Sequence, residues 1–302
     1  MKRLLALFLL VVGCSRANVI ARGATSVFYR SAEAPRHDAP ALREDARLTV
    51  QWVGHATTLV QLDDRMIATD PAITPTVGVI SKRVVEPGVD AEHFPSLDLV
   101  VISHMHFDHL SYASLEALAP KIALLAVPDE GLSYVPNLEF DAAEVAHWKS
   151  IEHRGMRVTC VPARHAGWRY GVDSWSRASG GWVVEYHGLS VYFAGDTGYD
   201  GPTYVEMRKR WPRLDLALLP IAPMEPHGFM ASRHMNPPEA LRAFVDLGAS
   251  TMVPIHFDTF INSLDEPGEA APALRRSMLE QHVANERVAV LQIGERRVLL
   301  GR

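Results

Sequence analysis

The sequence predicts an α/β fold in which two mixed β-sheets pack face to face and helices cover their outer faces, an αβ/βα sandwich. Three observations lead to this prediction. The second half of the chain repeats the pattern of the first half, apolar strands alternate with helical stretches in both halves, and polar residues follow the strands at corresponding positions. The chain of 302 residues is 48% hydrophobic and 22% charged, which is the composition of an ordinary globular protein.

The N-terminal residues 1–13 are typical of a secretory signal peptide. Lys2 and Arg3 precede an apolar run from Leu4 to Val12, which is too short to span a bilayer. The sequence VVGC that follows is similar to the lipobox of bacterial lipoproteins, in which Cys14 would be lipidated after cleavage. We therefore expect a lipoprotein signal peptide over residues 1–13 and a lipid-anchored protein in the bacterial cell envelope, at the outer membrane or in the periplasm. An ordinary signal peptide or a disordered start is the alternative.

Residues 14–45 are rich in Ala, Arg, Ser and Pro and show no clear periodicity, so we expect a tether or linker there. With Cys14 lipidated, Cys160 would be the only remaining thiol, and no internal disulfide could form. No linker rich in Gly, Ser or Pro divides the rest of the chain. We therefore predict one domain over residues 46–302 rather than two independent domains.

The first half of this domain predicts two strands joined by a turn, then an apolar strand, a helix and another apolar strand. The segments are TLVQLDDRMIATDPA (58–72), LDLVVIS (97–103), YASLEALA (112–119) and IALLAV (122–127). The second half has the same order in WVVEYHGLSVYFAGDTG (182–198), LDLALLP (214–220), PPEALRAFVDLG (237–248) and TMVPI (251–255). Because uninterrupted apolar strands are usually buried on both faces, we expect helices over both sheets.

The segment SHMHFDHL (103–110) places three histidines and one aspartate within six positions, directly after an apolar strand. These residues are His104, His106, Asp108 and His109. Imidazole nitrogens suit zinc, and the available carboxylates favour a second metal ion over a structural site of the cysteine type. Asp70, Asp196 and His256 follow other apolar strands, and ligands in layered α/β folds gather at the carboxyl ends of strands. The sequence thus predicts one shared metal site.

The motif SHMHFDH resembles the signature of metallo-β-lactamase-fold hydrolases, whose αβ/βα sandwich agrees with the internal two-fold repeat. One branch is more similar still: the zinc-dependent phospholipase D that hydrolyses N-acyl-phosphatidylethanolamine, with its bacterial relatives. Nine ordered blocks carry this resemblance, which are WVGHATTLVQ (52–61), TDP (69–71), LDLVVISHMHFDHLS (97–111), VPARH (161–165), FAGDTGY (193–199), LDLALLPI (214–221), EPHGFM (225–230), HMNPPEA (234–240) and IHFDTF (255–260).

The resemblance implies a site for two Zn²⁺ ions, or for another divalent metal in their place. The ligands of the first ion would be His104, His106 and His165. The ligands of the second ion would be Asp108, His109 and His256, and Asp196 would bridge the two ions. Asp108 would also orient the attacking hydroxide, and His234 would bind a phosphate oxygen or protonate the leaving group. Asp70 and His55 are expected to orient ligands rather than to bind metal.

The function that this resemblance implies is that of a dizinc metallohydrolase, which cleaves a phosphodiester by attack of a metal-bound hydroxide. The expected action is of the phospholipase D type on N-acyl-phosphatidylethanolamine-like lipids. Ala166 and Asp258 depart from the phospholipase pattern in substrate-facing segments, so the acyl and head-group specificity stays open. One alternative is a lactonase or another carbonyl-centred hydrolase, because GHAT (54–57) also occurs in similar sugar-phosphate lactonases. A non-catalytic metal-binding lipoprotein is a further alternative.

The charge balance narrows the expected partners. The formal net charge is −5, and the chain lacks the concentrated basic patches with which nucleic-acid-binding proteins neutralise phosphates. We therefore expect no nucleic-acid partner. The expected partners are a small-molecule or phospholipid substrate and a membrane, contacted through lipidated Cys14. The sequence leaves the oligomeric state open.

Overall fold

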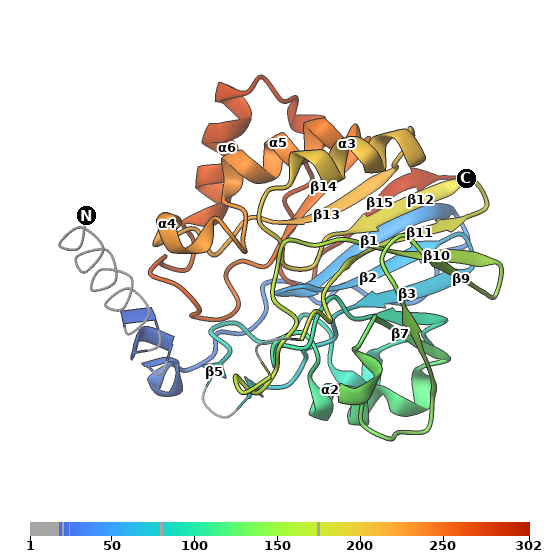
Figure 1. Cartoon of the computed structure of the whole chain (residues 1–302), viewed down its shortest axis with the longest axis horizontal. Coiled ribbons are helices and arrows are strands. Elements are labelled where there is room, and N and C mark those ends of the chain that lie inside the picture. The colour runs from blue at the N-terminus through green and yellow to red at the C-terminus, as the bar shows by residue number, and fades with distance from the viewer. Residues whose placement is uncertain (1–17, 20, 24, 79–80, 174–175) are drawn as a thin grey trace.

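The computed structural model describes residues 18–302 apart from residues 20, 24, 79–80 and 174–175 (Figure 1). The predicted signal peptide (1–13) and Cys14 lie outside the described residues. Within the part that is described, no helix is long and apolar enough to cross a bilayer. The lipid anchor and the domain boundary at residue 46 therefore stay predictions.

The first mixed sheet is built mainly from the first half of the predicted repeat. In the described residues it has seven strands in the order β15-β1-β2-β3-β6-β7-β8. Their bounds are β1 (Ala46–Gly54), β2 (Thr57–Leu62), β3 (Arg65–Thr69), β6 (Leu99–Val101), β7 (Leu124–Pro128), β8 (Asp141–Val145) and β15 (Arg296–Gly301). The pairs β15–β1, β1–β2 and β2–β3 are antiparallel. The pairs β3–β6, β6–β7 and β7–β8 are parallel.

The second mixed sheet repeats this plan with the second half of the chain. Over the same described residues its order is β14-β13-β12-β11-β10-β9. The bounds are β9 (Ser150–His153), β10 (Met156–Val161), β11 (Gly181–Tyr186), β12 (Leu189–Phe193), β13 (Leu216–Pro220) and β14 (Thr251–Ile255). In each sheet an antiparallel hairpin, β2–β3 or β11–β12, continues into two parallel strands, β6–β7 or β13–β14. The predicted mixed α/β fold is therefore confirmed.

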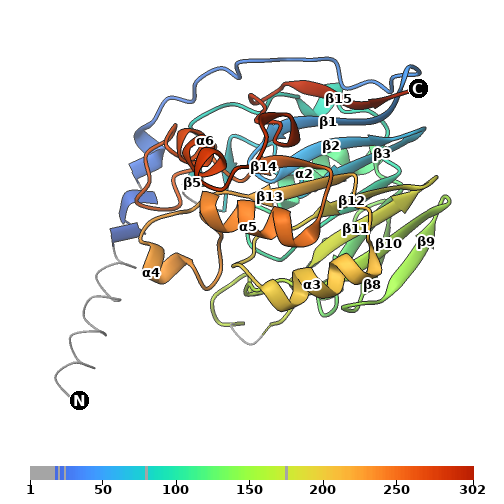
Figure 2. The same ribbon diagram turned by 90° about the horizontal axis from the view of Figure 1, so that it is seen from above.

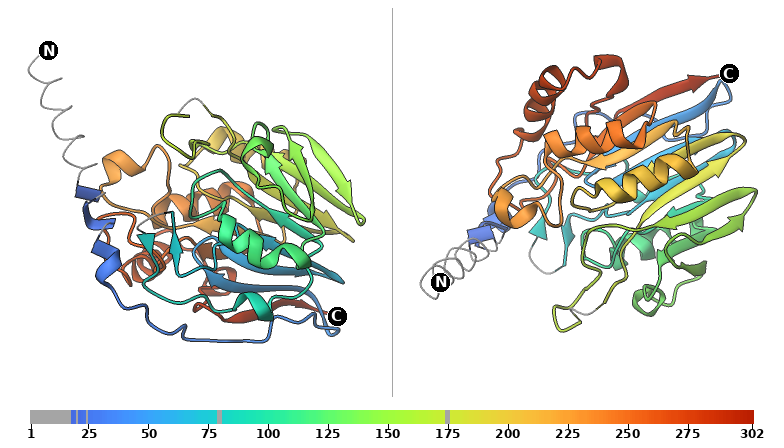
Figure 3. Two further views of the ribbon diagram at one scale, coloured as in Figure 1. Left: turned by 90° about the horizontal axis from the view of Figure 1, so that it is seen from below. Right: turned by 45° about the horizontal axis from the view of Figure 1, so that its top comes forward.

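Helices cover the outer faces of the two sheets, as Figures 1 and 2 show from two directions. α3 (Gly201–Arg210), α5 (Pro237–Leu247) and α6 (Ala270–Glu280) lie over the second sheet, and α2 (Tyr112–Leu118) lies on the opposite side of the molecule, over the first sheet (Figure 3). Neighbouring residues of β2 point to opposite faces, as the strand period of two requires. Val60 joins the core between the sheets with Trp182, whereas Leu59 joins the apolar cluster that contains Leu115 of α2.

α5 shows why the sequence forms this helix at these bounds. The Asn236 side chain accepts a hydrogen bond from the Glu239 backbone N–H, and the Glu239 carboxylate accepts one from the Asn236 backbone N–H, which closes a capping box. Pro237 occupies the first turn, and Gly248 ends the helix at φ 68° in the left-handed region. Because Asn236 caps the helix, the nearby His234 is free of that role.

Part of the segment that the sequence predicts as a tether contacts the domain. Ala32 forms a β-bridge with Val85, and the Asp38 carboxylate accepts from the Arg296 N–H at 2.8 Å. The short elements of the structure are the strands β4 (Thr76–Val77) and β5 (Ser81–Lys82), the helix α4 (His227–Met230), and the 3₁₀ turns η1 (Ser26–Phe28), η2 (Ala91–His93), η3 (Ala119–Lys121), η4 (Leu132–Tyr134) and η5 (Asn285–Arg287).

Candidate metal centre

The predicted metal ligands follow the carboxyl ends of strands from both sheets. β6 leads into the segment that holds His104 to His109, and β10 leads toward His165. β12 is followed by Asp196, and β14 is followed directly by His256. Because the sheets face each other, these four connections meet at one end of the sandwich, which gathers the side chains in one place.

The segment after β6 folds into a tight turn. The N–H groups of His109 and Leu110 both donate to the His106 carbonyl, at 3.1 and 2.9 Å. Before the turn, Ser103 is fixed by Asp70, whose carboxylate accepts from the Ser103 N–H at 2.6 Å and from its hydroxyl at 2.5 Å. Gly195 packs directly against Ser103, since a Cβ at Gly195 would lie 2.2 Å from the Ser103 Cβ. Only glycine fits this contact between the two halves of the site.

The first ligand cluster consists of His104, His106 and His165. The His106 Nδ1 lies 2.8 Å from the His104 Nε2 and 3.3 Å from the His165 Nε2. The His165 Nδ1 donates to the Arg233 carbonyl at 3.0 Å, and the His104 Nδ1 lies 3.0 Å from the Ser103 hydroxyl. Because a carbonyl can only accept, the proton of neutral His165 is on Nδ1 and its Nε2 lone pair faces the cluster. Three converging imidazole nitrogens are a donor set that suits Zn²⁺.

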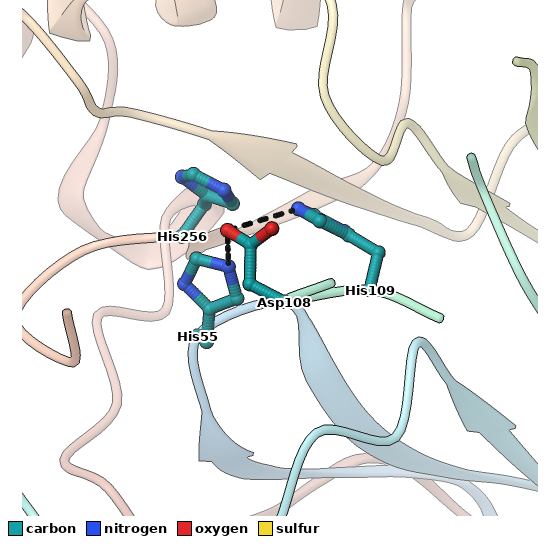
Figure 4. Close-up of side chains that lie close together, drawn as sticks. All are labelled: His55, Asp108, His109 and His256. Atoms are coloured by element: carbon teal, nitrogen blue, oxygen red, sulfur yellow. Dashed lines mark hydrogen bonds and ion pairs between the residues drawn. The ribbon is translucent and has the colours of Figure 1, made fainter. Parts of the chain in front are cut away.

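The second ligand cluster brings together Asp108, His109 and His256, with His55 beside them (Figure 4). The Asp108 Oδ2 lies 3.1 Å from the His55 Nε2 and 3.8 Å from the His109 Nε2. The remaining ring nitrogens are held from behind. The His109 Nδ1 donates to the Asp70 carboxylate at 2.6 Å, and the His256 Nδ1 donates to the Ala222 carbonyl at 3.0 Å. Asp70 and His55 thus contact predicted ligands, and the orienting role stays a prediction for both.

Asp196 lies between the two clusters. Its Oδ1 is 2.9 Å from the His256 Nε2, and its Oδ2 is 3.4 Å from the His109 Nε2. The same Oδ2 is 4.0 Å from the His104 Nε2 and 4.0 Å from the His165 Nε2. The carboxylate therefore reaches members of both clusters, as a bridging ligand must.

The donor atoms fit bound cations. The Asp196 Oδ1, the His109 Nε2 and the His256 Nε2 are buried, and none has a hydrogen-bond partner within the described residues. A buried polar atom without a partner is costly, and metal coordination would remove that cost. The set of imidazole nitrogens and carboxylate oxygens is also the chemistry that divalent zinc-type ions prefer.

Burial keeps most of the imidazoles neutral, as metal ligands must be. It lowers the pKa of His104 well below the usual histidine value, and the nearby His109 and His106 lower it further. Burial also lowers the pKa of His106 and of His55 to about 3 in each case, and it lowers the pKa of His165.

His109 and Asp196, in contrast to those neutral imidazoles, both favour their charged forms. Burial opposes the charged form of His109, yet the carboxylates of Asp196, Asp108 and Asp70 together raise its pKa well above the usual value. Burial likewise opposes the charged Asp196, but His256 and His109 hold the pKa of Asp196 well below its usual range. In the metal-free site both groups therefore carry charge, with the positive His109 among the carboxylates of Asp196, Asp108 and Asp70.

His234 also lies at the site. Its side chain is 13% exposed, and its Nδ1 lies 3.6 Å from the Asp196 Oδ2 without a hydrogen-bond partner in the described structure. Burial lowers its pKa well below the usual value. The catalytic role that the sequence suggests for His234 stays a prediction.

The two departures from the phospholipase pattern lie on different sides of the site. Asp258 accepts from the Gly268 N–H at 2.7 Å and lines a small cavity with His55 and His256. Ala166 follows His165 directly and is partly exposed. Sequence reasoning missed the contacts of Ser103, which touches Asp70, His104 and His109. The available signal was its position between the strand and the first ligand.

A comparison with protein families identifies the fold. The profile described as "Beta-lactamase superfamily domain" matches residues 65–257, a range that includes every predicted metal ligand from His104 to His256. The chain belongs to the β-lactamase superfamily. With its His and Asp clusters, it is a metal-dependent hydrolase of that superfamily.

Relatives within the superfamily carry different names. The chain is 32% identical to the "N-acyl-phosphatidylethanolamine-hydrolyzing phospholipase D 1" of Caenorhabditis elegans over 233 residues, which is 72% of this chain and 65% of that protein. It is 30% identical to a "UPF0173 metal-dependent hydrolase" of Methanoculleus marisnigri over 256 residues, 82% of this chain and 95% of that protein. Among solved structures, Igni18, a metallo hydrolase of Ignicoccus hospitalis, is 24% identical with a TM-score of 0.63, covering 83% of this chain and 97% of that one. The last likeness concerns the fold.

Proposed function

We propose that this superfamily member is a phosphodiesterase that uses two divalent metal ions and acts as a phospholipase D on N-acyl-phosphatidylethanolamine-like lipids. The observation that carries the proposal is Asp196, whose carboxylate lies within 4.0 Å of nitrogens in both ligand clusters. One ion would be held by His104, His106 and His165, the other by Asp108, His109 and His256, with Asp196 shared. The similarity to the nematode phospholipase D supports the choice of substrate class.

When bound, two such ions acidify a water molecule toward neutral pH and stabilise negative charge on phosphate oxygens. Asp108 would accept a hydrogen bond from the attacking water and fix its direction. Burial opposes the charge on Asp108, but His109 and a hydrogen bond from His55 keep its pKa below the usual range. The carboxylate is therefore available as an acceptor at neutral pH.

The reaction would break the phosphorus–oxygen bond on the head-group side. The water oxygen joins the phosphorus, the N-acylethanolamine oxygen leaves and takes up a proton, and phosphatidic acid remains. His234 is placed next to Asp196, and its imidazole, kept neutral by burial, would donate a hydrogen bond to a phosphate oxygen.

An exposed apolar rim beside the first cluster supports a lipid substrate. Phe107 lies in the chain between two predicted ligands, is 37% exposed, and has its ring 6.2 Å from that of Tyr170. Tyr170 is 57% exposed and Val172 is 77% exposed. Exposed apolar side chains grouped at a polar site are typical of surfaces that receive an apolar ligand. Anchoring at a membrane through Cys14 would bring this rim to its substrate.

The test uses the full chain, purified in detergent and loaded with zinc. It is mixed with vesicles that contain N-acyl-phosphatidylethanolamine, and mass spectrometry follows N-acylethanolamine and phosphatidic acid. Both products should form with the wild type and with Asp129→Asn, an exposed aspartate outside the clusters, but not with Asp108→Asn. Turnover of a lactone but of no phosphodiester would replace the proposal with the carbonyl-centred alternative. Tight zinc binding without turnover of either would favour a non-catalytic metal-binding protein.

A further inference from the structure

Arg169 is a buried cation that links two ligand-bearing segments. It lies four residues after His165, and only 3% of its surface is exposed. Its Nη1 donates to the Met105 carbonyl at 2.9 Å and to the Leu110 carbonyl at 2.8 Å. These two carbonyls flank residues 106–109, which supply three predicted ligands. One side chain from the His165 segment thus holds both ends of the turn after β6.

The guanidinium is also held between aromatic rings. Its Cζ lies 4.3 Å from the centre of the Phe107 ring and 4.0 Å from the centre of the Tyr112 ring. Phe107 belongs to the same turn, and Tyr112 is the first residue of α2. A planar guanidinium can stack on rings while its N–H groups donate in its own plane, which a lysine ammonium cannot do. The contacts therefore use properties that are specific to arginine.

The backbone of Arg169 is fixed as well. The Asp173 carboxylate accepts from the N–H groups of Arg169 and Tyr170, both at 2.8 Å, and from the Tyr134 hydroxyl at 2.9 Å. Because both the backbone and the guanidinium are held, the side chain acts as a rigid connection. Upstream on the same segment, the Trp168 ring lies 4.6 Å from the His106 ring.

We propose that Arg169 is a positioning residue that sets the placement of the His165 segment against the His104–His109 turn, and so completes the first metal position. This inference rests on the proposed function, because it takes His104, His106 and His165 as the ligands of one ion. Those three nitrogens come from two segments, and their spacing depends on how the segments are joined. Without Arg169, the Met105 and Leu110 carbonyls lose their donor, and the turn loses its tie to His165.

The experiment measures metal binding by the full chain. Zinc affinity is determined by competition with a chelator, and cobalt(II) absorption spectra report the coordination at each position. The variants are Arg169→Met and Arg169→Lys, and the control is Arg287→Met. Arg287 makes the same kinds of contact outside the site, since it donates to the Ala249 carbonyl at 2.7 Å and its Cζ lies 4.6 Å from the Phe244 ring centre.

We expect Arg169→Met to bind one of its two zinc ions about 10 to 100 times more weakly, the usual effect of losing a group that orients ligands. Arg169→Lys should bind with intermediate affinity, and Arg287→Met should match the wild type. The cobalt spectrum of Arg169→Met should change for one ion only. A merely structural role would lower the melting temperature of the metal-free variant and leave the zinc affinity of the folded protein unchanged.

Wild-type affinity and an unchanged cobalt spectrum in either Arg169 variant would overturn the inference. Arg169→Lys keeps the test decisive where Arg169→Met does not fold. Failure of the proposed function is a separate result, because it would appear as a wild-type protein that binds two zinc ions and cleaves no phosphodiester.

Discussion

The two ligand clusters differ in charge although they share one carboxylate. The first cluster consists of imidazoles, and the outer nitrogens of His165 and His104 meet neutral groups, the Arg233 carbonyl and the Ser103 hydroxyl. The second contains the carboxylate of Asp108, and the imidazole of His109 is backed by the carboxylate of Asp70 at 2.6 Å. A carboxylate behind a histidine makes the imidazole a stronger donor to metal. The two metal positions are therefore not equivalent, even though the two halves of the fold repeat one plan.

Removing the shared carboxylate should produce the largest effect, because both clusters lose it at once. In Asp196→Asn, both positions lose their common negative charge, so we expect kcat/KM for a phosphodiester to fall roughly a thousandfold. Metal content per chain should fall at the same time. The measurements are steady-state kinetics and elemental analysis after dialysis.

The matched control is Asp200→Asn, four residues later, where the carboxylate accepts from the Thr203 hydroxyl at 2.8 Å. Loss of a single metal ion from Asp196→Asn, with the other bound normally, would contradict a bridging role.

Removing the carboxylate behind His109 should weaken metal binding at the second cluster and leave metal binding at the first cluster unchanged. In Asp70→Asn, a neutral amide replaces the charged acceptor, so His109 becomes a weaker ligand and its ring is less firmly oriented. We expect about a 10- to 100-fold weaker affinity for one zinc ion and an unchanged affinity for the other. Chelator competition measures both constants. Asp98→Asn at the opposite end of β6, where the carboxylate accepts from the Met66 N–H at 2.9 Å, should change neither. Equal weakening of both ions would show that Asp70 supports the whole site rather than one cluster.

The sequence predicted the parts of the fold that have strong local patterns. The apolar strands β6 and β13 and the helices α2 and α5 lie within the segments predicted for them, and the hairpins β2–β3 and β11–β12 each begin one residue before theirs. It did not predict that β15 from the C-terminus pairs with β1, or that β8 joins the first sheet while β9 and β10 join the second. β8 is mostly exposed and has no clean apolar period, and a pairing across the whole chain leaves no local signal.

The same reason explains what the sequence could not predict at the site. The cluster His104 to His109 is visible because its residues are neighbours in the chain. The contact of His55 with Asp108 depends on the end of β1 lying against the turn after β6, and the link from Arg169 depends on a loop that follows a different sheet. Such contacts arise from the packing of distant segments, so residue spacing alone does not reveal them.

The metal-free protein should show the smallest of these effects, a loss of stability in acid. His106 has a pKa of about 3 when folded, whereas an unfolded histidine titrates near 6.5. As the pH falls below about 6.5, the unfolded chain takes up a proton that folded His106 refuses, so each such histidine lowers stability by up to about 1.4 kcal/mol per pH unit. His109 acts in the opposite direction, because its raised pKa gives stability that is complete below pH 6.5 and is lost as the pH rises.

Burial lowers the pKa of several histidines, whereas the carboxylates raise the pKa of His109. The several histidines should therefore outweigh His109, so that the stability of the metal-free protein falls as the pH falls. We expect the melting temperature in a chelator to fall by several degrees between pH 7 and pH 5. His106→Asn should reduce this dependence, and His93→Asn, whose side chain is 65% exposed, should not. A higher melting temperature at pH 5 than at pH 7 would mean that the charged His109, with the carboxylates around it, dominates the metal-free site. In that case the second cluster, rather than the first, would set how the empty site responds to pH.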